Sequence, residues 1–261
     1  MNARATAAPF QPAVAAIESE SSWAKLYRTA AAAAVVAVLL VPIQIAVFSL
    51  YPYPDTVAGW FELLAANPIA GLIDLDLLLV VDNVLLVVIA LATYVALRTV
   101  NASVTTIALG LWLLSLVLLI AANPAIEMLS LSDRFTAATS EAERGATLAA
   151  GEAMLATWEG TAFQVSYIVG QLGGITMGWV MLHSTTFSRW TAYTLIAGNI
   201  LGFGYYLPTV GLAVSAFSGV VLWVWFALIA RDFLRLSRTS ASPNSRDDPS
   251  SRNHVRIPRS V

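Results

Sequence analysis

Six long apolar runs restrict what this chain can fold into. A helix rises about 1.5 Å per residue, so crossing the ~30 Å hydrocarbon core of a bilayer takes about 20 residues. Runs of about this length occupy residues 29–50, 77–97, 104–122, 161–182, 190–207 and 210–229. None of the runs alternates with a two-residue period, and backbone in lipid must satisfy its own hydrogen bonds, so we expect helices and not a barrel. The predicted fold class is all-α, a polytopic membrane helical bundle with six transmembrane helices.

Composition supports this class and argues against several others. Apolar residues make up 58% of the chain and charged residues 11%, and the mean hydropathy is +0.73, which is far from a soluble domain. There is no Cys, and His183 and His254 are the only histidines, so neither a zinc site nor a thiol or Ser/His nucleophile is expected. The sequence has no phosphate-binding loop and no nucleic-acid module. We therefore predict no metal, no cofactor, no nucleic-acid partner and no enzymatic activity.

Basic residues set the predicted orientation. Twelve of the fourteen Lys and Arg residues fall in the segments that alternate onto one side: Arg4, Lys25, Arg28, Arg98, Arg189 and seven arginines from Arg231 to Arg259. The positive-inside rule makes that side cytoplasmic, with both termini on it, in a multi-pass protein of the cell membrane. The predicted divisions are a cytoplasmic tail at 1–28, a transmembrane domain at 29–236 and a disordered cytoplasmic tail at 237–261. The first apolar run is too long for a signal peptide and is expected to remain as a helix.

The connections on the outer side predict short helices of their own. Val57, Trp60, Phe61 and Leu64 follow i, i+3, i+4, i+7 spacing, which indicates a short helix lying on the outer leaflet. Ser140 and Glu143 have the spacing of a capping box that begins a helix running toward residue 158. The tetrad Ala-Ala-Asn-Pro occurs at residues 65–68 and 121–124, and we interpret it as a recurring turn.

One acidic residue lies inside an apolar run. Asp82, followed by Asn83, sits about a third of the way along the second run, where a carboxylate is costly and usually faces the bundle interior or a wet cavity. It marks either a site or a hydrogen-bonded side chain that holds helices together. Other polar residues lie at outer or middle depth, and would line an outward-facing pocket if they point inward. The candidate ligand-binding set is Asp82, Asn83, Asp76, Gln164, Gln171, Asn199 and Glu159.

Small residues recur every four positions in the last three runs. This spacing lets helix backbones approach closely in lipid, where packing drives association. The glycines that we assign to helix packing are Gly170, Gly174, Gly178, Gly198, Gly202, Gly211 and Gly219. The same stripes could alternatively form the face of a homo-oligomer.

Several short motifs resemble a known family. They are Asn123-Pro124 with Glu127 and Leu129-Ser130, Gly160-Thr161-Ala162-Phe163 with Ser166-Tyr167, Phe187-Ser188, and Gly202-Phe203-Gly204 through Leu207-Pro208. Over residues 77–236 the chain is similar to a family of uncharacterised prokaryotic multi-pass membrane proteins, domain of unknown function four-three-eight-six. The resemblance implies a multi-pass fold, and it implies no reaction, ligand or site.

Three functions are compatible with these patterns. The first is a non-enzymatic membrane module that binds or senses a ligand, or serves a partner protein, through the outward-facing polar pocket. The second is a carrier of a small solute or cation that uses Asp82, which the outer excess of acidic residues favours. The third is an intramembrane enzyme. The absence of a second intramembrane Asp on another predicted helix argues against it.

Overall fold

The protein is all-helical, as the sequence predicts. The computed structural model describes residues 10–241, which contain no strand. The elements are α1 (Phe10–Leu50), α2 (Val57–Ala66), α3 (Pro68–Asp74), α4 (Leu77–Leu97), α5 (Ala102–Ala122), α6 (Ala125–Ala137), α7 (Glu141–Trp158), α8 (Thr161–Leu182), α9 (Arg189–Gly202), the 3-10 helix η1 (Phe203–Tyr206) and α10 (Gly211–Ala241). Arg4, His254 and the predicted tail beyond residue 241 lie outside the described residues.

Five stretches are long and apolar enough to cross a membrane. They are Trp23–Leu50, Leu77–Leu97, Ala102–Ala137, Glu141–Leu182 and Ala213–Ser240. The run at 190–207, predicted as a span, is not among them. Its helix α9 has 14 residues, about 21 Å at 1.5 Å per residue. The chain then tightens into η1, so regular helix covers only part of the hydrocarbon thickness.

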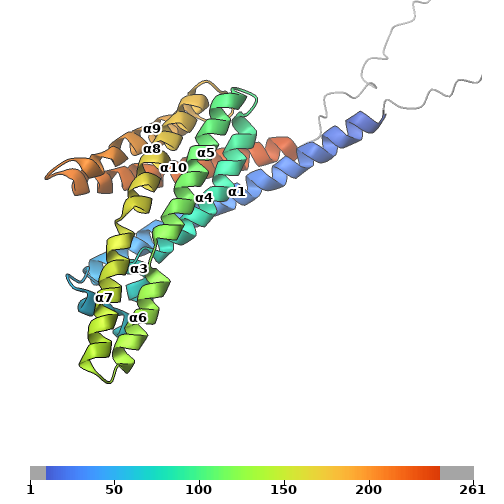
Figure 1. The fold of residues 1–261 in the computed structure, drawn as a ribbon. Coiled ribbons are helices and arrows are strands. Elements are labelled where there is room, and N and C mark those ends of the chain that lie inside the picture. The colour runs from blue at the N-terminus through green and yellow to red at the C-terminus, as the bar shows by residue number, and fades with distance from the viewer. Residues whose placement is uncertain (1–9, 242–261) are drawn as a thin grey trace, which may run out of the picture.

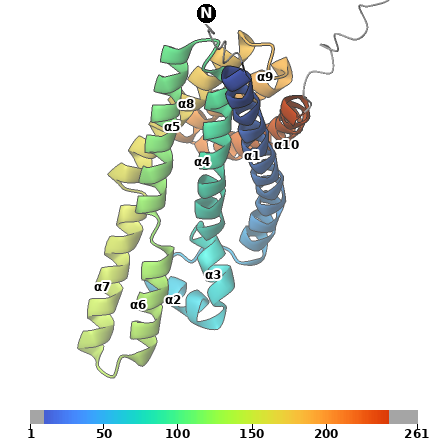
Figure 2. The same cartoon turned by 90° about the vertical axis from the view of Figure 1, so that its right-hand side faces the viewer.

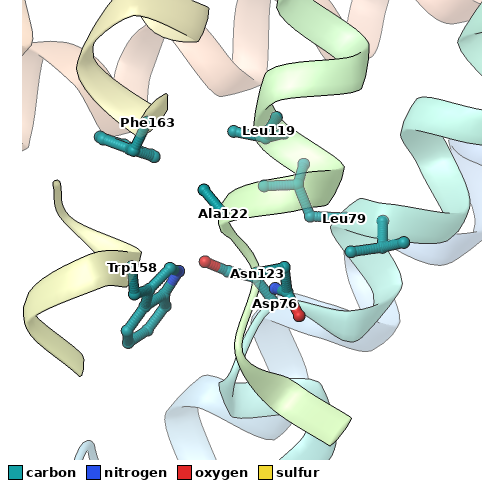
Figure 3. Close-up of a pocket in the computed structure, with 8 residues that line it drawn as sticks. Asp76, Leu79, Leu119, Ala122, Asn123, Trp158 and Phe163 are labelled. Atoms are coloured by element: carbon teal, nitrogen blue, oxygen red, sulfur yellow. The ribbon is translucent and has the colours of Figure 1, made fainter. Parts of the chain in front are cut away.

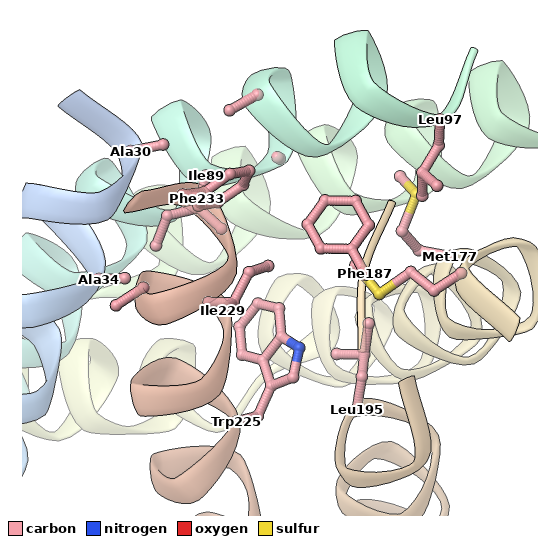
Figure 4. Close-up of a cluster of buried hydrophobic side chains, with 14 of the residues drawn as sticks. Ala30, Ala34, Ile89, Leu97, Met177, Phe187, Leu195, Trp225, Ile229 and Phe233 are labelled. Atoms are coloured by element: carbon pink, nitrogen blue, oxygen red, sulfur yellow. The ribbon is translucent and has the colours of Figure 1, made fainter. Parts of the chain in front are cut away.

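The bundle is held together by a core that involves α1, α4, α8, α9 and α10 (Figure 4). On α1 the residues facing this core are mostly alanines, including Ala30 and Ala34, which are fully buried. Their small side chains let the large residues of α10 approach, and the Phe233 ring stacks on Tyr27 with 6.0 Å between ring centroids. Close packing of this kind is what associates helices in lipid.

The connections predicted to lie on the outer side form a second, smaller core around α2, α6 and α7. Helix α2 buries Val57, Trp60, Phe61 and Leu64, which is the apolar face predicted from the sequence. That face packs against protein, since Ala125 and Met128 of α6 belong to the same buried cluster. Ser132 of α6 also donates a hydrogen bond to the Phe61 carbonyl (2.7 Å). The α6–α7 hairpin projects beyond the bundle, away from the N-terminal end of α1 (Figures 1 and 2).

Local capping explains where the outer helices begin. The predicted capping box is confirmed: the Ser140 hydroxyl accepts from the Glu143 amide, and the Glu143 carboxylate accepts from the Ser140 amide. Both copies of Ala-Ala-Asn-Pro are turns between helices. Asn67 ends α2 and caps α3 by accepting from Ala70 N (3.1 Å), and Asn123 ends α5 and accepts from Ala125 N (3.1 Å).

The long terminal helices extend past the predicted tail boundaries. Helix α1 begins at Phe10, so residues 10–28 are helical. Helix α10 continues to Ala241, so the predicted start of a disordered tail at Ser237 is wrong. The helix continues because Leu236 packs against the main core and the Ser237 hydroxyl donates to the Leu234 carbonyl (2.9 Å).

Candidate functional site

The C-terminal part of α1, the end of α3 and the start of α4 meet at a pair of aspartates. Asp74 is the last residue of α3, and Asp76 directly precedes α4. Asp76 has a left-handed backbone (φ 61°, ψ 26°), which Asp tolerates better than most residues. This turn directs the Asp76 side chain toward α1, where its Oδ1 accepts from Gln44 Nε2 (3.1 Å). The fully buried Leu75 separates the two carboxyl groups.

Asp74 is a buried acid with no hydrogen-bond partner. Its side chain is 0% exposed, and neither carboxyl oxygen has a donor or acceptor in contact. Burying an ionised carboxylate without partners is costly, so the neutral form is favoured. Burial accordingly raises the pKa of Asp74 to about 6. Below about pH 6 most of this group therefore carries a proton.

Asp76 is linked electrostatically to Asp74. Burial, followed by the nearby Asp74 charge, raises the pKa of Asp76 to about 7, against the opposing hydrogen bond from Gln44. The pKa of Tyr53 is also raised, by partial burial and by the Asp76 and Asp74 charges. The Tyr53 ring lies against Trp60, with 5.7 Å between centroids. Burial thus raises the pKa of both carboxyl groups toward neutral pH, and the Asp74 charge adds to the rise at Asp76.

A small cavity lies beside Asp76 (Figure 3). Its volume is about 10 Å³, close to the minimum for a single water molecule. Asn123, Trp158 and Phe163 contribute to its lining, and Asp82 does not. Asn123 Nδ2 also donates to the Leu75 carbonyl (2.7 Å). This bond fastens the end of α5 to the peptide that joins Asp74 to Asp76.

Asp82 and Asn83 lie deeper along α4. Asp82 is 7% exposed, and its Oδ1 is buried without a hydrogen-bond partner. Asn83 donates through Nδ2 to the Leu79 carbonyl of its own helix (2.7 Å). At 100° per residue, Asp82 and Asn83 project about 100° apart around α4. Asp76 precedes this helix in a left-handed conformation, so these three residues of the predicted set do not share one face.

The remaining predicted residues lie around α8, α9 and η1. The Gln171 side chain occupies the space that a side chain at position 202 would need, and Gly202 leaves that space free. The Asn199 side chain packs against Gly174 in the same way. Tyr206 donates to Gln164 Oε1 (2.9 Å). The other Gln164 contact is a bond from Nε2 to the backbone carbonyl of Glu159 (3.2 Å). None of these residues lines the cavity beside Asp76, so the candidate set is divided between two regions.

Six of the seven candidate packing glycines lie at close contacts. At each of these six positions an added Cβ would come too close to a neighbouring residue. The glycine and neighbour pairs are Gly170 with Ser115, Gly174 with Asn199, Gly178 with Ile196, Gly198 with Leu222, Gly202 with Gln171, and Gly211 with the Tyr205 carbonyl. Gly219 has no atom within 4 Å of that position. The α8, α9 and α10 interfaces thus depend on the absence of side chains at most of these positions.

Sequence reasoning missed the role of two acids. The sequence does not single out Asp74, although its position just before the second apolar run could have indicated a buried turn. Asp232 follows the last apolar run beside Arg231, where the sequence indicates an exposed charge, yet it is 1% exposed. Its Oδ2 accepts from Ser188 N (2.9 Å) and Thr191 Oγ1 (2.6 Å). A carboxylate from α10 therefore caps the first turn of α9, a contact between residues more than forty positions apart.

Comparison with family models, curated proteins and solved structures gives no match to this chain. Within residues 10–241, no three Asp, Glu or His side chains come together in a group that could hold a metal ion. The chemistry available beside Asp74 and Asp76 is that of two neighbouring carboxyl groups, an amide donor and a water-sized space.

Proposed function

We propose that the protein is a non-enzymatic, multi-pass module of the cell membrane that senses external pH by binding protons at Asp74 and Asp76. The observation that carries the proposal is Asp74, a fully buried carboxyl group whose two oxygens lack partners. A proton satisfies such a group without any further ligand, because it removes the charge that burial penalises.

The topology that we propose has six spans with both termini in the cytoplasm. The five long apolar stretches are joined by α9 with η1 as the sixth, which crosses at an incline (Figure 1). Exposed aromatic and aliphatic residues on this segment, such as Trp190 at 72%, are suited to lipid contact. At the proposed inner end, Arg98 lies over the Trp23 ring (5.3 Å). The acidic pair then belongs to the outer end.

The size of the site favours a proton over an organic ligand. A cavity of about 10 Å³ has room for one water at most, whereas pockets for small molecules are typically ~300–1,000 Å³. The pair also titrates in a useful range, since burial raises the pKa of Asp74 to about 6 and that of Asp76 to about 7. Both charges would therefore appear as the external pH rises from acidic to slightly alkaline values.

Three contacts would transmit the change in charge. Gln44 joins Asp76 to α1 (3.1 Å), and Asn123 joins the intervening peptide to α5 (2.7 Å). Helix α6 begins immediately after Asn123 and Pro124, so a movement at this turn reaches the α6–α7 hairpin. Two neighbouring carboxylates that lose their protons repel each other and recruit water, which loosens the joint between α3 and α4.

A single cysteine tests this proposal in a chain that has none of its own. Leu75→Cys lies between the two acids and is fully buried. We expect a membrane-impermeant thiol reagent added outside to label it faster at pH 8 than at pH 5, beyond the increase that thiol ionisation causes. The double variant Leu75→Cys/Asp74→Asn has the same thiol and so corrects for thiol ionisation. In it, the additional increase in labelling rate between pH 5 and pH 8 should be lost. Equal pH responses in the two backgrounds would refute the sensor.

The second candidate is a cation carrier, which Asp82 favours. Its unpartnered Oδ1 lies on α4, the helix that begins directly after the acidic pair, so a proton or small cation bound outside could pass to it. Purified protein in liposomes should then give a proton or sodium flux that Asp82→Asn abolishes and Asp133→Asn, on exposed α6, leaves intact. A flux unchanged by Asp82→Asn would count against the carrier.

We also propose that the chain shares its fold with the uncharacterised multi-pass membrane family that its short motifs resemble. Its motifs coincide with structural joints, namely the Asn123 turn before α6, the Gly160 start of α8 and the Gly202 end of α9. Short motifs at joints support a shared fold more directly than a shared ligand. We therefore draw the proposed sensing role from the acidic pair and not from the resemblance.

A further inference from the structure

A groove lies between α1 and the C-terminal half of α10, which run side by side (Figures 1 and 2). Its volume is about 610 Å³, within the ~300–1,000 Å³ typical of ligand sites. One wall is apolar and includes Val35 and Leu39 of α1 with Leu234 of α10. The other end carries Arg231, Arg235, Arg238 and the hydroxyl of Thr239.

The three arginines form one stripe. At 100° per residue, positions 231, 235 and 238 fall within about 60° of each other around α10. Arg231 pairs with Asp232 Oδ1 (3.1 Å) while its side chain stays 59% exposed, and Arg235 donates to the Thr186 carbonyl (2.6 Å). A guanidinium has five N–H donors, so both retain donors for a further acceptor.

Charge balance at the groove favours an anion. Asp232 is the one carboxylate in contact with this stripe among the described residues, and its Oδ2 is already engaged by Ser188 and Thr191. Three cations therefore line this end of the groove, with Asp232 as the one carboxylate beside them among the described residues. Phosphate oxygens match the planar guanidinium geometry, which gives charge-assisted and often bidentate hydrogen bonds.

The apolar wall distinguishes a lipid from a soluble phosphate. Val35 is 45% and Leu39 62% exposed, and both lie in the membrane-spanning part of α1. A hydrocarbon chain along these side chains would continue from a headgroup held by the arginines. Basic pockets between helices at the cytoplasmic side are suited to anionic lipid headgroups.

We infer that this groove binds an anionic phospholipid, with the phosphate held by Arg231, Arg235 and Arg238 and one acyl chain along Val35, Leu39 and Leu234. The site lies on α1 and α10, apart from the acidic pair, and its binding does not require the proposed pH response. It would fix the inclination of α10 in the inner leaflet by tying the helix end to a headgroup.

Native mass spectrometry of the full chain in neutral detergent tests the inference. Added phosphatidylglycerol should bind the wild type at least tenfold more tightly than phosphatidylcholine. The double variant Arg231→Gln/Arg238→Gln should lose at least tenfold in phosphatidylglycerol affinity. Arg189→Gln is the matched control, because Arg189 is an exposed inner arginine outside the groove, and its affinity should stay within twofold.

A second variant separates the lipid from its headgroup. Ala227 is exposed on the groove side of α10, so Ala227→Trp fills the groove and leaves all three arginines in place. It should also weaken phosphatidylglycerol binding at least tenfold, with an unchanged gel-filtration profile. Three results would overturn the inference: equal affinity for the two lipids, an Arg189→Gln loss as large as that of the double variant, or sn-glycerol 3-phosphate competing as strongly as the intact lipid.

Discussion

Replacing Asp74 with Asn should stabilise the protein at alkaline pH. Asp74 is fully buried without partners, and burial raises its pKa to about 6 from 3.8. The folded state therefore holds a proton that the unfolded state has already released between these two values. Because the folded state binds more protons, the free energy of unfolding of the wild type falls as pH rises through this window. Asn has nearly the same shape and carries no charge to bury.

The expected gain follows from the pKa. Each pH unit between 3.8 and about 6 corresponds to 1.36 kcal/mol, so at pH 8 the ionised Asp74 costs about 2–3 kcal/mol. Asp74→Asn removes that cost and should raise the unfolding temperature by roughly 5–10 °C, given about 2–4 °C per kcal/mol for chains of this size. At pH 4 the difference should fall below about 1 kcal/mol, because the folded group is then protonated and the unfolded group is close to half protonated.

Thermal unfolding followed by intrinsic tryptophan fluorescence in detergent, at pH values from 4 to 8, measures both effects. The variant should also titrate at lower pH than the wild type, since Asp74 contributes to the raised pKa of Asp76. Asp133→Asn removes an exposed outer charge and should leave the pH dependence unchanged. If Asp74→Asn destabilised the protein at pH 8, or stabilised it equally at pH 4, the reasoning from burial would be wrong.

Three further predictions concern stability and use the same assay. Asp232→Ala should lower the free energy of unfolding by about 2–4 kcal/mol, because it leaves the first turn of α9 without its buried acceptor. Gly174→Ala should cost about 1–3 kcal/mol, since its Cβ would overlap the Asn199 amide, whereas Gly219→Ala meets no atom within 4 Å and should be neutral or stabilising by up to ~1 kcal/mol. Ser140→Ala should cost about 1 kcal/mol by removing the N-cap of α7.

Each of these three predictions has an outcome that contradicts it. Asp232→Ala acting no more strongly than Arg231→Ala would show that the exposed ion pair, and not the cap, matters, since exposed pairs contribute about 0–1 kcal/mol. Equal effects of the two glycine substitutions would remove the argument from close packing. A Ser140→Ala protein whose α7 backbone amides exchange hydrogen at the wild-type rate would show that the box does not hold the helix start.

Much of the helical framework follows from local sequence. Predicted runs 77–97 and 161–182 coincide with α4 and α8, and the capping box and the amphipathic spacing each give a helix where expected. These features depend on residues within a few positions of each other, so they can be read without knowing the neighbours. The prediction of one continuous span at 190–207 failed because composition does not reveal where a helix ends. The α-helix ends at Gly202 and a 3-10 helix follows.

The candidate site could be predicted only in part. Asp82 and Asp76 stand out as costly acids in apolar surroundings, and that argument is local. The partner of Asp76 is Gln44, more than thirty residues away, and Gln171 and Asn199 pack against glycines of neighbouring helices. A helix can turn any of its sides toward a neighbour, so depth along the chain does not decide which polar groups meet.

The sequence by itself determined that this chain is an all-helical membrane protein, where most of its helices begin, and that an acid lies within an apolar run. Helix caps depend on residues a few positions apart, and hydrophobicity and charge asymmetry are totals over a segment. The order of residues along the chain is therefore enough to predict the features that depend on them. Only the tertiary structure decided that Asp74 is buried without a partner, that Asp232 caps α9, and that three arginines border a groove against α1. Those properties depend on helix rotation and crossing, which are set by packing between residues far apart in the chain.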